Sequence, residues 1–170
     1  MNALLKIPAR YGIAGVIIQG LLFLTLYWLG KNPLVYSRPW DFGFLMIPVM
    51  IFFGMKDFKD HHNGGELRFW QGMTSGFVIY TVIALGSAFF LWNFLTWGDA
   101  SVLDGYIADR LQLLADNREQ FEQTLGPELY QQQIVKMKET SAWVVAVDDF
   151  WKKLSIGLFL TIIIAVILRK

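Results

Sequence analysis

The sequence predicts an all-α, polytopic integral membrane protein with four transmembrane helices and an extracytoplasmic helical hairpin between helices three and four. Hydrophobic residues make up 55% of the 170 residues and charged residues only 17%, with a mean hydropathy of +0.42. An ordinary soluble domain carries about 25% charged residues. The apolar residues gather in four runs, and a long charged segment with helical periodicity separates the third run from the fourth.

Residues 1–97 contain the first three apolar runs. The first, residues 11–29, would form a helix about 28 Å long at ~1.5 Å per residue. The second, residues 40–55, is short and interrupted by a proline, and the third, residues 70–97, can cross a membrane while tilted. The fourth lies in residues 152–170, where basic side chains flank the apolar stretch and can snorkel. A soluble bundle would need a polar face on each helix, which the first, third and fourth runs lack.

Basic residues orient these four helices. Cytoplasmic loops carry an excess of Lys and Arg, and the loop at residues 30–39 has only two such residues. We therefore expect both termini and the turn between the second and third helices to lie in the cytoplasm. The basic residues on this predicted cytoplasmic side are Lys6, Arg10, Lys56, Lys59, Arg68, Arg169 and Lys170.

Residues 98–151 are predicted to form the extracytoplasmic hairpin. Residues recur at alternating steps of four and three from Ile107 to Leu125, apolar at every position except Arg118, which is typical of a packed helix. Gly126-Pro127 suits the end of one helix and the start of the next. A second seam starts at Tyr130 and stays in phase with the fourth span, so we expect one continuous helix there. The hairpin could dock a partner or close only on itself.

The segment around the two adjacent histidines has two interpretations. Asp57 and His61 are spaced one helical turn apart and could share a metal, with His62 as a further weak candidate. A catalytic zinc usually needs three protein ligands, and the sequence has no third histidine. Glu66 could complete an acid/base or metal set only if the chain folded back at the following turn. The second interpretation is an ordinary turn between two helices.

The turn interpretation rests on the glycine pair Gly64-Gly65. Glycine supplies the left-handed backbone conformation that a tight turn after a helix requires. Lys56, Lys59 and Arg68 flank this turn. They are predicted to contact anionic lipid headgroups, each contributing about 1 kcal/mol near the surface.

The third apolar run begins with a small-residue pattern. Gly72 and Gly76 form a GxxxG motif, and Ala84 and Ala88 repeat the four-residue spacing. Small residues at this spacing let helix backbones approach closely in lipid. We expect them to pack against another helix of the same chain in preference to a second subunit.

Several function classes lose support from what the sequence lacks. It has no cysteine, which excludes disulfides, thiolate metal sites and cysteine nucleophiles. It has no glycine-rich nucleotide-binding motif and no serine hydrolase motif. No ionisable residue lies well inside an apolar run, which argues against an ion-driven transporter. We predict no cofactor and no nucleic-acid partner.

The residues around the glycine pair carry a family resemblance. Residues 64–69 (GGELRF), then Gly72 and Gly76 opening a helix, and the apolar end at residues 164–170 resemble a bacterial membrane-protein family known as domain of unknown function 4199. The resemblance covers nearly all of the chain, although the family often has serine at the position of Arg68. It implies a four-span inner-membrane protein of Gram-negative bacteria, without an assigned activity or catalytic residues. It also implies a polyprenyl-phosphate glycosyltransferase of the envelope as a partner.

These observations lead to three functional hypotheses. The first is a non-catalytic accessory or scaffolding subunit of the bacterial inner membrane, supporting an envelope-biosynthesis complex. The alternative is a protein that handles a lipid or small solute, for example a polyprenyl-linked lipid. The third is a membrane enzyme that uses the carboxylate and histidine cluster at residues 57–66.

Overall fold

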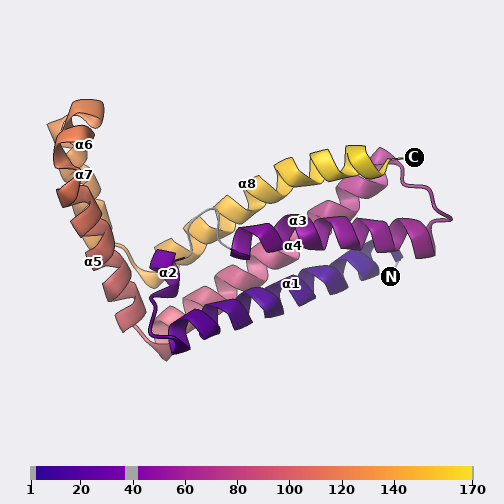
Figure 1. The fold of residues 1–170 in the computed structure, drawn as a ribbon, viewed down its shortest axis with the longest axis horizontal. Coiled ribbons are helices and arrows are strands. Elements are labelled where there is room, and N and C mark those ends of the chain that lie inside the picture. The colour runs from indigo at the N-terminus through magenta and orange to yellow at the C-terminus, as the bar shows by residue number, and fades with distance from the viewer. Residues whose placement is uncertain (1–2, 37–41, 170) are drawn as a thin grey trace.

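The computed structural model describes residues 3–36 and 42–169, and all the regular elements in this part of the chain are helices. Four of them lie side by side in an elongated bundle (Figure 1). The contacts between them show that two run in one direction and two in the other. These helices are α1 (Ala3–Trp28), α3 (Phe42–Asp57), α4 (Phe69–Asn93) and α8 (Ala142–Leu168).

Three helices are long and apolar enough to cross a membrane. They are α1 with 26 residues, α8 with 27, and the 30-residue segment made of α4 and the following π-helical turn η2 (Phe94–Gly98). In contrast, α3 has 16 residues and is about 24 Å long, less than the ~30 Å hydrocarbon core. The predicted fourth crossing therefore stays a prediction.

The helix bounds differ from the predicted spans. The first helix begins at Ala3 instead of residue 11, because helix formation continues past the apolar run into residues that include Lys6 and Arg10. The second predicted span corresponds to α3, which continues through Pro48. Neighbouring helices in a membrane bundle can satisfy the backbone group that a proline leaves unpaired. Residues 40 and 41 of the predicted second span lie outside the described part of the chain, as does Lys170.

The expectation of one continuous helix into the fourth span is wrong. One helix, α7 (Pro127–Lys138), ends before Ser141, where the backbone is extended (φ −107°, ψ 165°). The Ser141 hydroxyl then accepts a hydrogen bond from the Val144 amide at 3.4 Å and caps α8. Serine at an N-cap starts a new helix, so apolar periodicity alone does not decide whether the chain continues straight.

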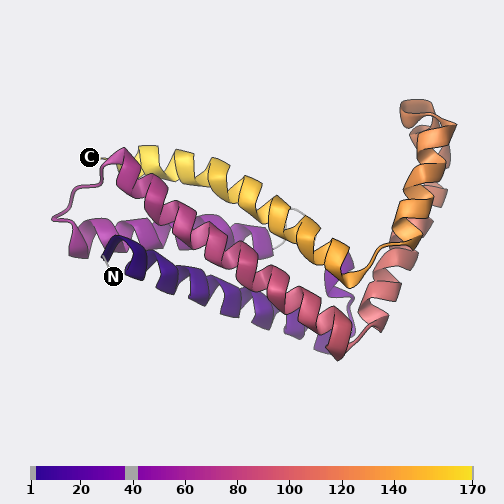
Figure 2. The ribbon, with the colours of Figure 1, turned by 180° about the vertical axis from the view of Figure 1, so that it is seen from behind.

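A projecting arm, residues 101–138, leaves one end of the bundle at a steep angle (Figures 1 and 2). It consists of α5 (Ser101–Asp116), α6 (Arg118–Leu125) and α7, which returns beside the other two. The sequence correctly predicts the reversal, because Gly126 has a φ of +83° and Pro127 opens α7. Tyr130 is buried between the helices, and its hydroxyl donates to the Leu114 carbonyl at 3.3 Å.

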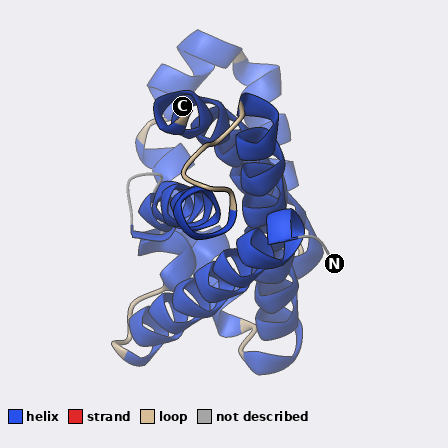
Figure 3. Cartoon of the chain, turned by 90° about the vertical axis from the view of Figure 1, so that its right-hand side faces the viewer, coloured by secondary structure: helices blue, strands red, loops and turns tan. Residues whose placement is uncertain are grey.

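Apolar side chains fill the bundle in two separate clusters. The larger one lies where α1, α3, α4 and α8 meet, towards the end of the bundle that carries the two chain termini and faces the viewer in Figure 3. The smaller one lies near the root of the arm. Buried members of the larger cluster include Ile47, Ile51, Met55, Leu67, Ile79 and Ile83, and those of the smaller one are Leu91, Leu95 and Val102.

Candidate functional site at the α3–α4 turn

Asp57 connects two parts of the molecule at the end of α3. The next residues form the π-helical turn η1 (Phe58–His62). The Tyr11 hydroxyl donates to Asp57 Oδ2 at 3.2 Å, and His61 Nδ1 lies 3.0 Å from Asp57 Oδ1. The His62 ring lies elsewhere, with Nδ1 3.5 Å from the Asp57 backbone oxygen. The structure therefore brings Asp57 and His61 together as the sequence spacing suggests, and it adds Tyr11.

This arrangement provides two side-chain groups, Asp57 and His61, for a metal ion or a proton. Among the described residues, no group of three or more His, Cys, Asp or Glu side chains lies close enough to hold a metal. Glu66 takes part in the turn through its backbone carbonyl, which accepts a hydrogen bond from Asn63. With 72% of the His61 side chain exposed, the pair is a surface contact that links η1 to α1 through Tyr11.

The turn itself is held by its backbone and by an amide pair. Gly64 and Gly65 have φ values of +67° and +82°, the left-handed conformation expected of them. The Asn63 amide donates to Gln71 Oε1 at 3.0 Å, and Gln71 Nε2 donates back to Asn63 Oδ1 at 3.3 Å. This amide pair is not among the predictions made from the sequence, although two amide residues on either side of a glycine pair are a usable signal. Reciprocal bonding makes the turn a defined structure.

The three basic residues near the turn have different environments. Lys59 donates from Nζ to the Leu168 carbonyl at 3.1 Å, which satisfies a free carbonyl at the end of α8. Lys56 and Arg68 are exposed. Headgroup contact remains a prediction for all three. For Lys59, a headgroup would compete with the Leu168 carbonyl of the same chain.

The predicted small-residue motif lies against α8. A Cβ added to Gly72 would be 2.9 Å from Ala165 Cβ, and one added to Gly76 would be 2.3 Å from Thr161 Cγ2. Ala84 is fully buried, whereas Ala88 is half-buried further along α4. These contacts place the partner of Gly72 and Gly76 within the same chain, since residues of α8 already occupy the space above both glycines.

The matching half of this seam was missed in the sequence. Gly157, Thr161 and Ala165 recur every four residues along α8, and a Cβ on Gly157 would lie 2.4 Å from Tyr80 Cβ. The same spacing rule that singled out Gly72 and Gly76 would have found them in the last apolar run.

A polar contact on α8 was also missed. Lys153 Nζ lies 2.7 Å from Asp149 Oδ2, and the Lys153 side chain is only 11% exposed. The Ser87 hydroxyl lies 3.5 Å from the same carboxylate oxygen. Because α8 begins at Ala142, Asp149 lies on a bundle helix and not in the hairpin to which the sequence assigns it.

Comparison with known proteins bears on the whole chain. The model of a protein family of unknown function, DUF4199, matches residues 10–170. The chain belongs to this family. The match confirms the resemblance that was based on the GGELRF segment and its flanks. No curated protein and no solved structure matches the chain.

In this DUF4199 protein the arm is attached at a hydrogen-bonded root. The Tyr27 hydroxyl donates to Asp99 Oδ2 at 2.8 Å, and the Ser101 amide donates to Asp99 Oδ1 at 2.9 Å. Hydrogen bonds from Ser101, and then from Tyr27, hold the pKa of the Asp99 carboxyl below its ordinary value because they favour its charged form. Asn32 Nδ2 donates to the Val102 carbonyl at 2.8 Å.

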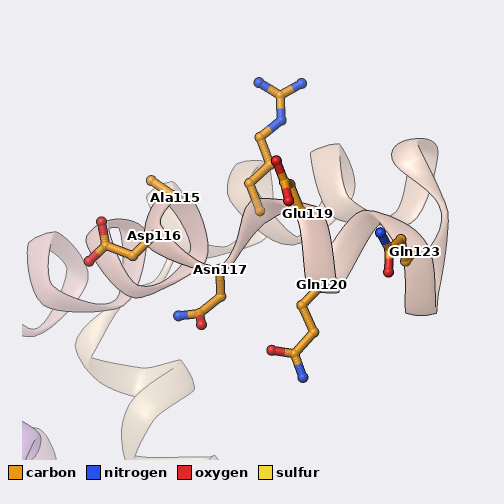
Figure 4. Close-up of a pocket in the computed structure, with 7 residues that line it drawn as sticks. Ala115, Asp116, Asn117, Glu119, Gln120 and Gln123 are labelled. Atoms are coloured by element: carbon orange, nitrogen blue, oxygen red, sulfur yellow. The ribbon is translucent and has the colours of Figure 1, made fainter.

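The far end of the arm has an open polar hollow (Figure 4). It lies where α5 gives way to α6 at Asn117. Arg118 Nε donates to Glu122 Oε1 at 2.8 Å, and this bond raises the pKa of Arg118 by stabilising its charged form. The lining residues are Ala115, Asp116, Asn117, Arg118, Glu119, Gln120 and Gln123.

Proposed function

We propose that this DUF4199 protein is a non-catalytic accessory or scaffolding subunit of the bacterial inner membrane that supports an envelope-biosynthesis complex. The observation that carries the proposal is the projecting arm, which stands clear of the bundle on a hydrogen-bonded root. A scaffold has to present its binding surface in a defined position. The bonds from Tyr27 and Asn32 to the start of the arm supply that definition.

The arm also has surface to offer a partner. Tyr130 is buried between the helices of the arm, yet Leu113, Leu129 and Val135 are 39%, 49% and 52% exposed. Burial of apolar surface is the dominant favourable contribution to most protein–protein association. A partner docked on the arm would bury part of this exposed apolar surface.

The proposed topology has four spans, both termini in the cytoplasm and the arm outside. The two described chain ends lie at the same end of the bundle, opposite the arm (Figure 1). Basic residues at that end favour the cytoplasm. The fourth span would be α3, which is short but packs among the three long helices and is extended by η1. A tilted or locally thinned bilayer accommodates a short span at modest cost.

The test is to extract the native complex in a mild detergent and identify bound proteins by mass spectrometry. Deleting residues 100–140 should remove a stoichiometric partner and leave membrane insertion intact. A sharper variant combines Leu113→Glu with Leu129→Glu, and its matched control combines Gln123→Glu with Gln131→Glu at exposed polar positions of the same arm. A partner that survives the deletion would contradict the docking role.

A second candidate function is the handling of a lipid, for example a polyprenyl-linked lipid. It is favoured by the exposed Lys56 and Arg68 at the basic end of the bundle. It predicts one defined lipid in native mass spectra, reduced in the Lys56→Ala/Arg68→Ala double variant. Bulk phospholipid alone would count against it.

The enzyme hypothesis has its own test. It requires the half-buried Asp57 and the exposed His61, with His62 and Glu66, to act on a substrate at the cytoplasmic surface. We expect a His61→Ala/His62→Ala double variant to keep full function in cells. We assign the contact between Asp57 and His61 a structural role, and the Tyr11–Asp57 hydrogen bond remains in this variant. Loss of function with normal protein levels would revive an enzymatic role.

A further inference from the structure

The contacts between helices place α1 and α4 in a definite axial register. A Cβ on Gly12 would lie 2.7 Å from Val82 Cβ, and a Cβ on Gly86 would lie 2.5 Å from Val16 Cγ2. Residue numbers rise together along the two helices, so the helices are parallel. Arg10, two positions before Gly12, is therefore level with Tyr80, two positions before Val82.

The register between α4 and α8 is equally well defined. Gly72 faces Ala165, Gly76 faces Thr161, and Tyr80 faces Gly157, so these helices are antiparallel. Arg10 on α1 is consequently level with Gly157 on α8. From Gly157 to Arg169, the next basic residue towards that end of α8, the distance along the helix is about 18 Å at ~1.5 Å per residue.

The same offset recurs at the other end of the bundle. Lys153 is four residues before Gly157, which makes it level with Ala84 on α4 and hence with Ala14 on α1. Beyond that level α1 stays free of charge to Leu29, a distance of about 22 Å at ~1.5 Å per residue. The apolar part of α1 is thus displaced towards the arm, relative to the apolar part of α8, by a similar distance at both ends.

Both displaced surfaces face outward. The helices lie on opposite sides of α4 in both side views (Figures 1 and 2). Exposed apolar side chains on α1 include Ile13, Ile17 and Leu21, and those on α8 include Phe159, Ile163 and Val166. An upright bundle would leave either Arg10 on α1, or Lys153 and its partner Asp149 on α8, within the hydrocarbon core, where charged side chains are costly. Snorkelling of a long side chain recovers only part of such an offset.

We infer that the apolar band of this bundle is oblique, and that the bundle axis lies in the bilayer with a tilt on the order of 30–40°. This tilt angle follows from the axial offset between the apolar parts of α1 and α8, from a spacing of ~8–10 Å between adjacent helices, and from snorkelling of basic side chains at each boundary. The tilt brings Arg10 and Arg169 to one membrane surface together. It also brings Lys153 and the end of α1 to the other. This inference rests on the proposed membrane topology and is independent of the accessory role.

The test uses two pairs of exposed positions at matched axial levels. Leu5 and Ile162 are 41% and 40% exposed. Each lies one residue further from the arm than the level shared by Lys6, Gly76 and Thr161. Ile17 and Trp151 are 57% and 59% exposed, next to the level of Val16 and Gly86. Because the chain has no cysteine, a single cysteine at each position can carry a spin label.

The measurement is the accessibility of each label to oxygen and to a water-soluble nickel chelate in proteoliposomes. Tilt predicts Leu5→Cys and Trp151→Cys at the aqueous boundary, and Ile162→Cys and Ile17→Cys in the hydrocarbon. We expect the nickel accessibility to differ at least fivefold within each pair, in opposite senses. Equal depths within both pairs, or the reverse pattern, would overturn the tilt. Depth does not depend on which side faces in, so a wrong orientation or a missing partner leaves this test valid.

Discussion

The α4–α8 seam and the projecting arm are two ways of packing helices within one chain. In the seam, Gly72, Gly76 and Gly157 lack side chains, so the opposing helix comes within contact of the backbone. In the arm, one large side chain, Tyr130, fills the space between helices whose surfaces are mostly polar. The seam packs closely because side-chain volume is absent there. The arm packs because the volume of the Tyr130 side chain fills the space between its helices. In lipid, association relies on close packing, whereas in water it relies on burial of apolar surface.

The two regions should therefore fail in opposite ways. Adding atoms should damage the seam, and removing atoms should damage the arm. Four changes test this contrast and its consequences at the turn and at the arm root.

Tyr130→Ala should have the largest effect. Truncating a buried aromatic residue costs about 3–5 kcal/mol, and here it also removes the hydrogen bond to the Leu114 carbonyl. We expect amide hydrogen exchange in α5–α7 to accelerate by more than about 100-fold while the bundle stays protected. Leu129→Ala, at a 49% exposed neighbour, is the control and should change exchange little. Similar effects of the two variants would show that the arm has no internal core.

Gly76→Ala should have the next largest effect. The new methyl group would lie 2.3 Å from Thr161 Cγ2 and 2.8 Å from Met55 Cε, so the bundle has to shift. We expect a loss of about 1–3 kcal/mol in the free energy of unfolding in detergent micelles. In the control Gly20→Ala, the methyl group meets only the Phe90 ring, at 4.0 Å. A seam that tolerated both substitutions equally would not be close-packed.

Gly65→Ala should have a smaller effect of a different origin. No atom lies within 4 Å of the added Cβ, so the cost comes from the φ of +82° alone. We expect the free energy of unfolding, measured by thermal denaturation, to fall by about 1–2 kcal/mol. Gly65→Asn should lose less, because asparagine tolerates the left-handed conformation better. Equal losses for alanine and asparagine would mean that the backbone conformation is not the cause.

The smallest effect concerns Asp99 and is dependent on pH. Its folded-state pKa is lowered by hydrogen bonds from Ser101 and from Tyr27, so its stabilising contribution is present above the ordinary Asp pKa of about 3.9. That contribution is lost as the pH falls through the lowered pKa. Wild type should melt above Asp99→Asn at pH 7, and the difference should vanish in acid below that pKa. A difference that grew towards low pH would have the wrong sign.

Local sequence features predict much of the candidate site. The left-handed conformations of Gly64 and Gly65 and the Gly126-Pro127 reversal follow from turn chemistry, which depends on neighbouring residues. The pairing of Asp57 with His61 follows from helical spacing. The role of Tyr11 does not, because 46 residues separate it from Asp57. Likewise, Ser141 stands in an apolar phase that suggests a continuous helix, and only its capping bond shows the break.

The sequence by itself determined the helical class, three helices long and apolar enough to cross a membrane, and the positions of the sharpest turns. These properties depend on the transfer of apolar side chains from water and on backbone preferences of single residues, both of which are local. Only the tertiary structure decided that Gly76 meets Thr161 and that Val16 meets Gly86. Those contacts set the axial offset between α1 and α8, because register depends on how the surfaces of two distant segments fit together.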